Sequence, residues 1–184
     1  MNLDIRPMQD ADLDAIVQLS LLAWAPVFAS FEQVLGTEIY ARLHPNWRES
    51  QAKGVRIACQ DAENEVWVAV VDETVVGFIT YTLDHQAQQG EVYLLAVHPD
   101  HQNQGIGTAL NQLAMEKMRE SGMHLAVVST GGDPGHAPAR RAYEKVGYTP
   151  LPLVRYYKAL QPYTDSKDTI RNKQTGTRLY RRTP

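Results

Sequence analysis

The residues best suited to chemistry lie in and around a short glycine-bearing stretch, Gln102-x-x-Gly105-x-Gly107. Two glycines let a loop adopt positive φ and approach a ligand closely. A helical pattern follows at once, so the free N–H groups and the dipole of a helix start would attract an anion. The apolar run from Val92 to Val97 just before the loop is typical of a strand buried on both faces. This order predicts a pyrophosphate-binding loop, although a tight turn without a ligand also fits the glycines alone.

Two common nucleotide-binding motifs do not describe this stretch. The glycines are not followed by Lys and then Ser or Thr, which excludes the phosphate loop of nucleoside triphosphatases. Position 110 is Leu110, so the third glycine of the dinucleotide-binding fingerprint is missing as well. The loop must therefore belong to another class of anion-binding motif.

The sequence Leu95-Ala96-Val97-His98-Pro99, followed by Gln102-x-x-Gly105-x-Gly107, resembles the acetyl-CoA motif of the GNAT family of N-acetyltransferases. In that family the motif reads Gln/Arg-x-x-Gly-x-Gly/Ala. A second family hallmark is matched by Tyr143-Glu144-Lys145-Val146-Gly147-Tyr148. The two motifs occur in the family's order and together span roughly residues 90–160. The resemblance implies an α/β fold with a mixed central sheet, splayed in the middle and flanked by helices, that takes acetyl-CoA as co-substrate.

The resemblance also assigns cofactor contacts. The backbone of the strand would hold the pantetheine arm, and the N–H groups of the loop would hold the pyrophosphate. His136 stands where many members carry a pantetheine-binding asparagine, so its equivalence is open, and a role on the substrate side is an alternative. The expected cofactor-binding residues are Leu95, Ala96, Val97, Gln102, Asn103, Gln104, Gly105, Ile106, Gly107, Thr108, His136 and Arg140.

Two residues are candidates for proton transfer. In the family, the tyrosine at the position of Tyr143 lies near the coenzyme sulfur, where a phenol can protonate the departing thiolate. Many members use a carboxylate on the central strand to deprotonate the amine, and Glu91 is the best-placed carboxylate here. Tyr93, two residues further on, would share its face of the strand. The alternatives are a packing role for Tyr143 and a solvated strand end for Glu91.

The acceptor side is expected between the first two strands. Trp24 and Phe28 are our candidate substrate contacts there, with core packing as the alternative for each aromatic residue. No metal site is expected. The expected acceptor is a small-molecule or peptide amine, whose identity the sequence leaves open.

The helices and strands that must position these residues are predicted from the spacing of apolar residues and from the proline, glycine and capping residues that start or end each element. We expect one domain over residues 1–160 and a polar, basic tail over residues 161–184. Pro26 is expected to end the first helix. The expected strands are residues 5–7, 65–71, 74–83, 92–97, 124–129 and 154–160. One expected helix follows residue 10, two span residues 31–43 and about 47–57, one runs from residue 107 to a cap at residue 122, and one spans residues 139–146.

Composition and charge narrow the function further. Residues 1–160 carry 12 Lys and Arg against 19 Asp and Glu, which argues against nucleic acid as a partner and suits a cationic amine. No apolar run of membrane-spanning length and no secretory signal is expected. The single Cys59 is consistent with a reducing cytoplasm and is expected to be a buried thiol. The sequence does not determine the oligomeric state, and a homodimer is one possibility.

We therefore expect an acetyl-CoA-dependent N-acetyltransferase in which a primary amine attacks directly in a ternary complex. Cys59 lies outside both motifs, so no thiol intermediate is expected. Two alternatives remain: a non-catalytic acyl-CoA-binding or sensing module, and an acyltransferase that uses a longer acyl-CoA.

Overall fold

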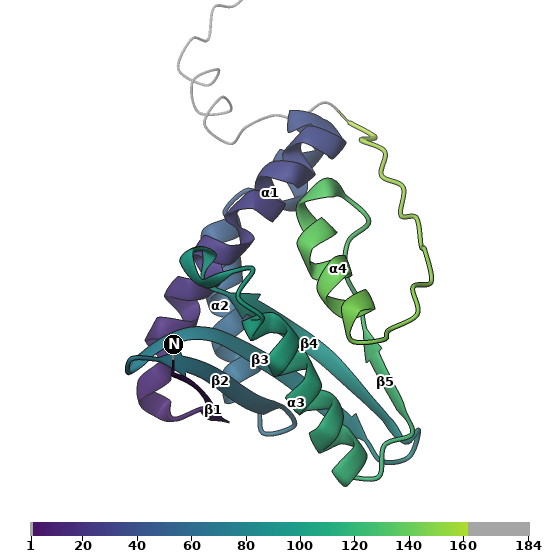
Figure 1. The fold of residues 1–184 in the computed structure, drawn as a ribbon. Helices are drawn as coiled ribbons and strands as arrows, with labels where there is room; N and C mark the ends of the chain where they lie inside the picture. Colours follow the sequence, from purple (N-terminus) through teal and green to yellow (C-terminus); the bar gives the residue numbers. More distant parts are fainter. Residues whose placement is uncertain (1, 162–184) are drawn as a thin grey trace, which may run out of the picture.

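The computed structural model describes residues 2–161, which form a five-stranded mixed sheet (Figure 1). The strands lie in sequence order, and every neighbouring pair is antiparallel except the parallel pair β4–β5. A parallel pair needs a crossover, and helix α3 supplies it. The strands are β1 (Leu3–Pro7), β2 (Glu65–Val71), β3 (Thr74–Asp84), β4 (Gln89–Val97) and β5 (Leu125–Val128). The expected mixed, open α/β sheet is confirmed.

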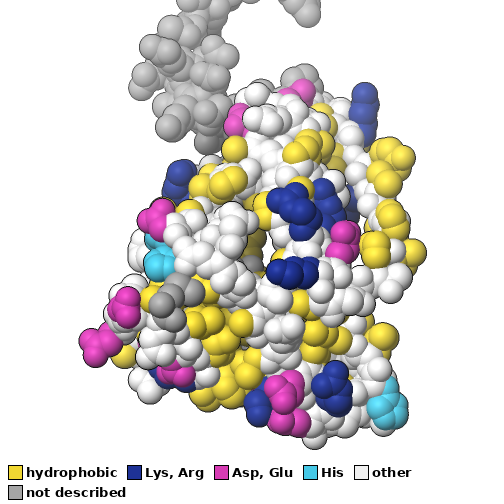
Figure 2. All heavy atoms as spheres, in the orientation of Figure 1, with side chains coloured by type: hydrophobic (Ala, Val, Ile, Leu, Met, Phe, Trp, Pro, Cys, Tyr) yellow, Lys and Arg dark blue, Asp and Glu magenta, His cyan; other side chains and the backbone are white. Residues whose placement is uncertain are grey.

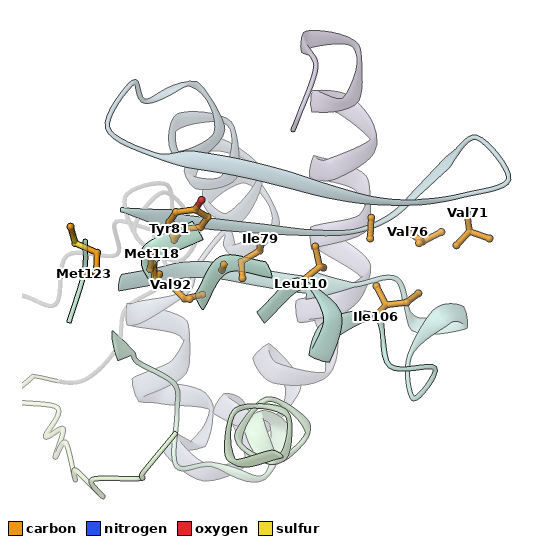
Figure 3. Close-up of a cluster of buried hydrophobic side chains, with 11 residues drawn as sticks. Val71, Val76, Ile79, Tyr81, Val92, Ile106, Leu110, Met118 and Met123 are labelled. Carbon is orange, nitrogen blue, oxygen red and sulfur yellow. The ribbon is translucent and has the colours of Figure 1, made fainter. Parts of the chain in front are cut away.

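Helices cover both faces of the sheet (Figure 1). Helix α3 (Ile106–Glu120) packs on one face, and Figure 3 shows its buried side chains meeting those of β3 and β4. Helices α1 (Leu13–Leu43) and α2 (Trp47–Gln60) cover the other face. Helix α4 (Ala137–Lys145) follows β5, and three short 3₁₀ turns complete the fold: η1 (Asp10–Asp12), η2 (Pro99–His101) and η3 (Pro134–His136).

Helix α1 departs from the expectation at Pro26. The helix continues through this proline and bends instead at Gly36, whose φ is 74°. A proline inside a helix removes one hydrogen bond and costs about 3 kcal/mol. Burial of apolar side chains on both sides of Pro26, such as Leu19 and Phe28, offsets that cost.

The expectation that no segment reaches membrane-spanning length also needs correction. Residues 10–43 are long and apolar enough to cross a membrane by length and composition, with a mean hydropathy of 1.5 over the most apolar window. Ile16, Val17 and Leu19 from this helix are at most 2% exposed and pack against the sheet. Their burial accounts for the apolar character of α1.

The sheet opens between β4 and β5. Only the first half of β4 pairs with β5, over Gln89–Val92 and Leu125–Val128. A bulge sits at the end of this paired half, because Thr80 lies opposite Leu94 and Tyr81 opposite Val92, which leaves Tyr93 without a partner on β3. Bulges bend and twist a strand. From residue 93 onward β4 turns away from β5, and the described residues place no strand on that edge.

The last expected strand is not formed. Residues 149–160 follow α4 as irregular, exposed chain. A strand requires a partner for its backbone groups, and within residues 2–161 none lies beside this segment. The tail expected over residues 161–184 lies outside the described residues apart from Gln161.

Candidate active site

The loop that leads into α3 has the geometry of an anion-binding site. Asn103 and Gly105 both adopt positive φ, of 60° and 86°. Gly105 is the residue before the helix, and no side chain of the described residues caps this end. The first-turn N–H groups of a helix have no partner within the helix. They therefore remain available to a ligand, with the helix dipole adding to the attraction. We call residues 102–108 the anion cradle.

Gly107 contributes open space to the anion cradle. A Cβ built on Gly107 would meet only the Val97 side chain, at an ordinary contact distance of 3.6 Å. Gly77 differs, because a Cβ there would crowd Ala96 and α3 at 3.1–3.3 Å. Packing inside the protein thus explains the glycine at position 77 but not the one at position 107. The absence of a side chain at Gly107 suits close approach by a ligand.

The polar side chains of this loop hold its shape. The Gln102 amide donates to the Val97 carbonyl at 3.1 Å, and the Gln104 amide donates to the Asp100 carbonyl at 3.2 Å. His98 Nδ1 accepts from the Asp100 N–H. These bonds use the side chains within the loop, so the groups left to face a ligand are the backbone N–H groups. The contribution of Gln102 and Gln104 to cofactor binding stays a prediction.

The free edge of β4 runs directly into the anion cradle. Leu95 and Val97 face the core under α3, while Leu94 and Ala96 face the core under α1. With both faces packed, the backbone edge turned toward β5 is the part of residues 93–97 left for a ligand. An extended chain can add to such an edge as a strand does. A pantetheine arm along this edge would place its pyrophosphate at the loop.

Tyr143 lies on α4, on the far side of the opening. Its side chain is 9% exposed, and its ring packs edge-on against Tyr148 at a centroid distance of 5.9 Å. Burial, with a smaller contribution from Tyr148, raises the pKa of Tyr143 to about 12. The phenol therefore keeps its proton at neutral pH and can donate it or a hydrogen bond. The buried Tyr148 hydroxyl has no partner among the described residues.

A polar network, Ser30–Asp133–His136, fastens the turn before α4 to helix α1. Ser30 donates to Asp133 Oδ2 at 2.7 Å, and His136 Nδ1 lies 2.5 Å from Asp133 Oδ1. The Gly135 N–H donates to the Ser30 hydroxyl at 2.9 Å. Gly135 must be glycine here, because a Cβ would come within 2.7 Å of Ser30. The network therefore fixes the start of α4 and, through it, the position of Tyr143.

Electrostatics within this network favour an ionised aspartate. Burial alone would raise the pKa of Asp133, but hydrogen bonds from Ser30, His136 and the Gly135 N–H outweigh it and hold the pKa below its ordinary value. Arg140 supports the same loop by donating to the carbonyls of Gly131 and Asp133 at 2.5 and 2.9 Å. His136 and Arg140 thus have structural partners, and their predicted contacts with the cofactor stay predictions.

Aromatic rings form a continuous wall beside His136. Phe31 packs against His136 and stacks on His44, each at a centroid distance of 5.4 Å. Phe28 stacks on Trp47 at 4.3 Å and also contacts Phe31. The wall joins α1, α2 and the turn before α4. Phe28 is buried within this wall, and its predicted contact with a substrate stays a prediction.

The other predicted substrate and base residues are dispersed along β4 and α1. Trp24 packs beside Phe78 in the core under α1. Glu91 is half-buried on the paired part of β4. Tyr93 is 62% exposed at the bulge, so simple two-residue alternation from Glu91 does not hold through this point. The shared role of Glu91 and Tyr93 stays a prediction.

Cys59 is a buried free thiol, as expected. Burial raises its pKa to about 11, so the thiolate needed for nucleophilic chemistry is scarce at neutral pH. Within residues 2–161 no group of three or more His, Cys, Asp and Glu side chains could hold a metal ion.

Sequence reasoning missed two residues of the network, Ser30 and Asp133. They are 103 positions apart, and no spacing rule links a serine within a helix to an aspartate in a distant loop. The Asp133-Pro134 pair did carry a local signal, because Asp is a common residue before a helical turn that starts with proline. Asp133 indeed accepts from the Gly135 N–H.

Comparison with known proteins identifies the class. The model of the acetyltransferase (GNAT) family matches residues 31–148. The chain belongs to this family. Mycothiol acetyltransferase of Saccharomonospora viridis is 29% identical over 119 residues, which are 56% of this chain and 38% of that protein. The corresponding protein of Beutenbergia cavernae is 35% identical over 71 residues, 39% of this chain and 23% of that protein. The matches span at most half the length of these curated relatives.

Solved structures share the fold. PaiA N-acetyltransferase of Thermoplasma acidophilum, in complex with coenzyme A, has a TM-score of 0.60 at 18% identity, over 81% of this chain and 91% of that one. The aminoglycoside acetyltransferase AAC(6')-Iy, in complex with a CoA-linked bisubstrate analogue, has a TM-score of 0.59 at 16% identity, over 86% and 99%. At these identities the neighbours show that the fold is shared.

Proposed function

We propose that the protein is an acetyl-CoA-dependent N-acetyltransferase that transfers the acetyl group to a primary amine by direct attack in a ternary complex. The observation that carries the proposal is the free edge of β4 over residues 93–97, which leads into the uncapped anion cradle. The edge fits a pantetheine amide chain, and the cradle fits its pyrophosphate. Acetyl-CoA is thereby the co-substrate.

In this reaction the amine nitrogen forms a bond with the acetyl carbonyl carbon, and the carbon–sulfur bond breaks. The departing thiolate takes a proton, for which Tyr143 is our candidate donor, because burial keeps its phenol protonated. The acceptor arrives as an ammonium ion and must lose a proton before it attacks. Glu91 is our candidate base on β4, acting directly or through water. Both roles rest on the resemblance to the family; Tyr143 lies on α4, and Glu91 lies on the paired part of β4, two residues before the opening begins.

The acceptor we propose is a small-molecule amine. The excess of acidic residues over residues 1–160 favours a cationic substrate. The aromatic wall of Phe28, Phe31, His44 and Trp47 offers flat apolar surface next to the turn before α4. The names of the related proteins, mycothiol acetyltransferase and aminoglycoside acetyltransferase, also point to small-molecule acceptors.

The test is an assay of acetyl-CoA-dependent thiol release against a panel of aminoglycosides, small amines, amino acids and peptides. Release that requires a particular amine, with the acetylated amine found by mass spectrometry, is the expected result. Acetyl-CoA binding without release for any amine would favour a binding module instead. Faster release with a longer acyl-CoA than with acetyl-CoA would show that the longer acyl-CoA is the donor.

A further inference from the structure

The opening beside β4 depends on the bulge at Tyr93. Before the bulge, Gln89–Val92 of β4 pair with β5, and after it the strand leaves β5. In the space-filling view the surface is hollowed beside α4, where Lys and Arg side chains gather (Figure 2). A bulge interrupts the regular ladder of hydrogen bonds between two strands. Each buried N–H group that loses its usual acceptor there needs another one.

Thr80 on β3 supplies such an acceptor. Its side chain is 0% exposed, and its hydroxyl oxygen accepts a hydrogen bond from the Leu94 N–H at 3.1 Å. Leu94 is the first residue after the bulge and lies opposite Thr80 in the register. Burying a hydroxyl is costly unless it is hydrogen-bonded, and a valine would fill nearly the same space. The bond to Leu94 therefore gives the hydroxyl a role that packing alone does not require.

Two hydrogen bonds define how the backbone of β4 is turned after the bulge. The N–H groups of Leu94 and of His98, which directly follows β4, both donate to β3. The backbone groups of successive residues in a strand point to opposite edges. The N–H groups of Leu95 and Val97 therefore point to the other edge, which is the open one. This edge is the one that we assign to the pantetheine arm.

We propose that Thr80 is a positioning residue of the cofactor-binding edge. Its hydroxyl holds the Leu94 N–H against β3, and this bond keeps the N–H groups of Leu95 and Val97 turned to the open edge. Without the hydroxyl, β4 would be free to change its register on β3 after the bulge. Thr80 is buried, so it acts through the backbone of β4. The inference rests on the proposed function, because it takes the ligand of the edge to be acetyl-CoA.

The two parts of the cofactor site should respond differently to a change at Thr80. Thr80 lies opposite the start of the open edge, whereas the anion cradle follows the end of that edge. Thr80→Val removes the hydroxyl and should lower acetyl-CoA affinity about three- to tenfold, as expected for one buried hydrogen bond. Binding of the phosphorylated ADP moiety of coenzyme A, which lacks the pantetheine arm, should stay unchanged. Thr80→Ser keeps the hydroxyl and should bind acetyl-CoA as the wild type does.

Amide hydrogen exchange tests the hydrogen bond without any ligand. The Leu94 amide should exchange slowly in the wild type and in Thr80→Ser, and faster in Thr80→Val. Thr80→Ala makes the same deletion with a smaller side chain and replaces Thr80→Val if that variant does not fold. Acetyl-CoA added to the wild type should slow exchange at Leu95 and Val97 more than at Leu94.

Ile79→Val is the matched control for a general loss of stability. Ile79 is the fully buried neighbour of Thr80 on β3, and this change removes one carbon atom and no polar group. Its stability, measured by denaturant unfolding, should fall while acetyl-CoA affinity stays that of the wild type. An equal loss of affinity in Ile79→Val and Thr80→Val overturns the proposal.

Two other results would also overturn the role of Thr80. One is unchanged Leu94 exchange in Thr80→Val, and the other is parallel loss of binding by acetyl-CoA and by the ADP moiety in that variant. Failure of the wild type to bind acetyl-CoA would instead overturn the proposed function. Exchange at Leu94 would still decide whether Thr80 holds the strand.

Discussion

Substitutions at Gly107 separate binding from folding in the anion cradle. A Cβ at this position meets only the Val97 side chain, at 3.6 Å, so the protein itself has room for one. Gly107→Ala should keep acetyl-CoA binding, because the motif of the family accepts Gly or Ala here. Gly107→Leu adds three further carbon atoms in the space that we assign to the pyrophosphate. The Leu variant should therefore fold and fail to bind tightly.

The expected magnitudes follow from this geometry. Replacing Gly by Ala in a helix stabilises it by about 0.5–1 kcal/mol, with the lower end apt for the first turn. Gly107→Leu should lower acetyl-CoA affinity at least tenfold, which corresponds to about 1.4 kcal/mol. Gly54 in α2 is a matched control, because a Cβ there meets no atom within 4 Å. Gly54→Leu should alter neither affinity nor fold.

Calorimetric titration with acetyl-CoA and denaturant unfolding of the four proteins make the comparison. Loss of affinity in Gly107→Leu, with the stability of the wild type, supports the anion cradle. Wild-type affinity in Gly107→Leu would refute the assignment of residues 102–108 to the pyrophosphate. A general loss of stability in this variant would refute our claim that the site has room.

Three further predictions concern proton transfer and the polar network. Tyr143→Phe should lower turnover by roughly 10²-fold or more with acetyl-CoA affinity nearly unchanged; full activity would assign Tyr143 to packing. Glu91→Gln should lower turnover by about 10²–10⁴ on a strongly basic amine and regain activity as pH rises, because solvent then deprotonates the amine; an unaltered pH profile would remove Glu91 as the base. The pKa of the Asp133 carboxyl is lower in the folded protein than in the unfolded chain. The ionised carboxylate therefore stabilises the fold at any pH above its unfolded-state pKa, and this stabilisation is lost as the pH falls through the folded-state pKa. Asp133→Asn should thus lower the free energy of unfolding by about 1.5–3 kcal/mol at pH 7 and by much less in acid, and an equal loss at both pH values would contradict this account.

The sequence alone determined the parts of the site that depend on local backbone chemistry. The apolar run from Val92 to Val97 predicted a buried strand, because burial on both faces requires a continuous apolar pattern. Gly105 was correctly predicted to turn the loop, because a positive φ is a property of the residue itself, whereas Gly107 lies in the first turn of α3 and contributes open space instead. Each of these signals lies within a few residues of the structure that it specifies.

Only the tertiary structure decided features that depend on distant partners. Pro26 stays within a helix because packing on both sides outweighs a local cost. Ser30 and Asp133 meet because the sheet and α1 bring together segments 103 residues apart. Residues 154–160 have the composition of a strand but form none, because a strand exists only where a partner supplies the other half of its hydrogen bonds. A local sequence pattern can specify the conformation of a residue, but the tertiary fold determines which distant residue becomes its partner.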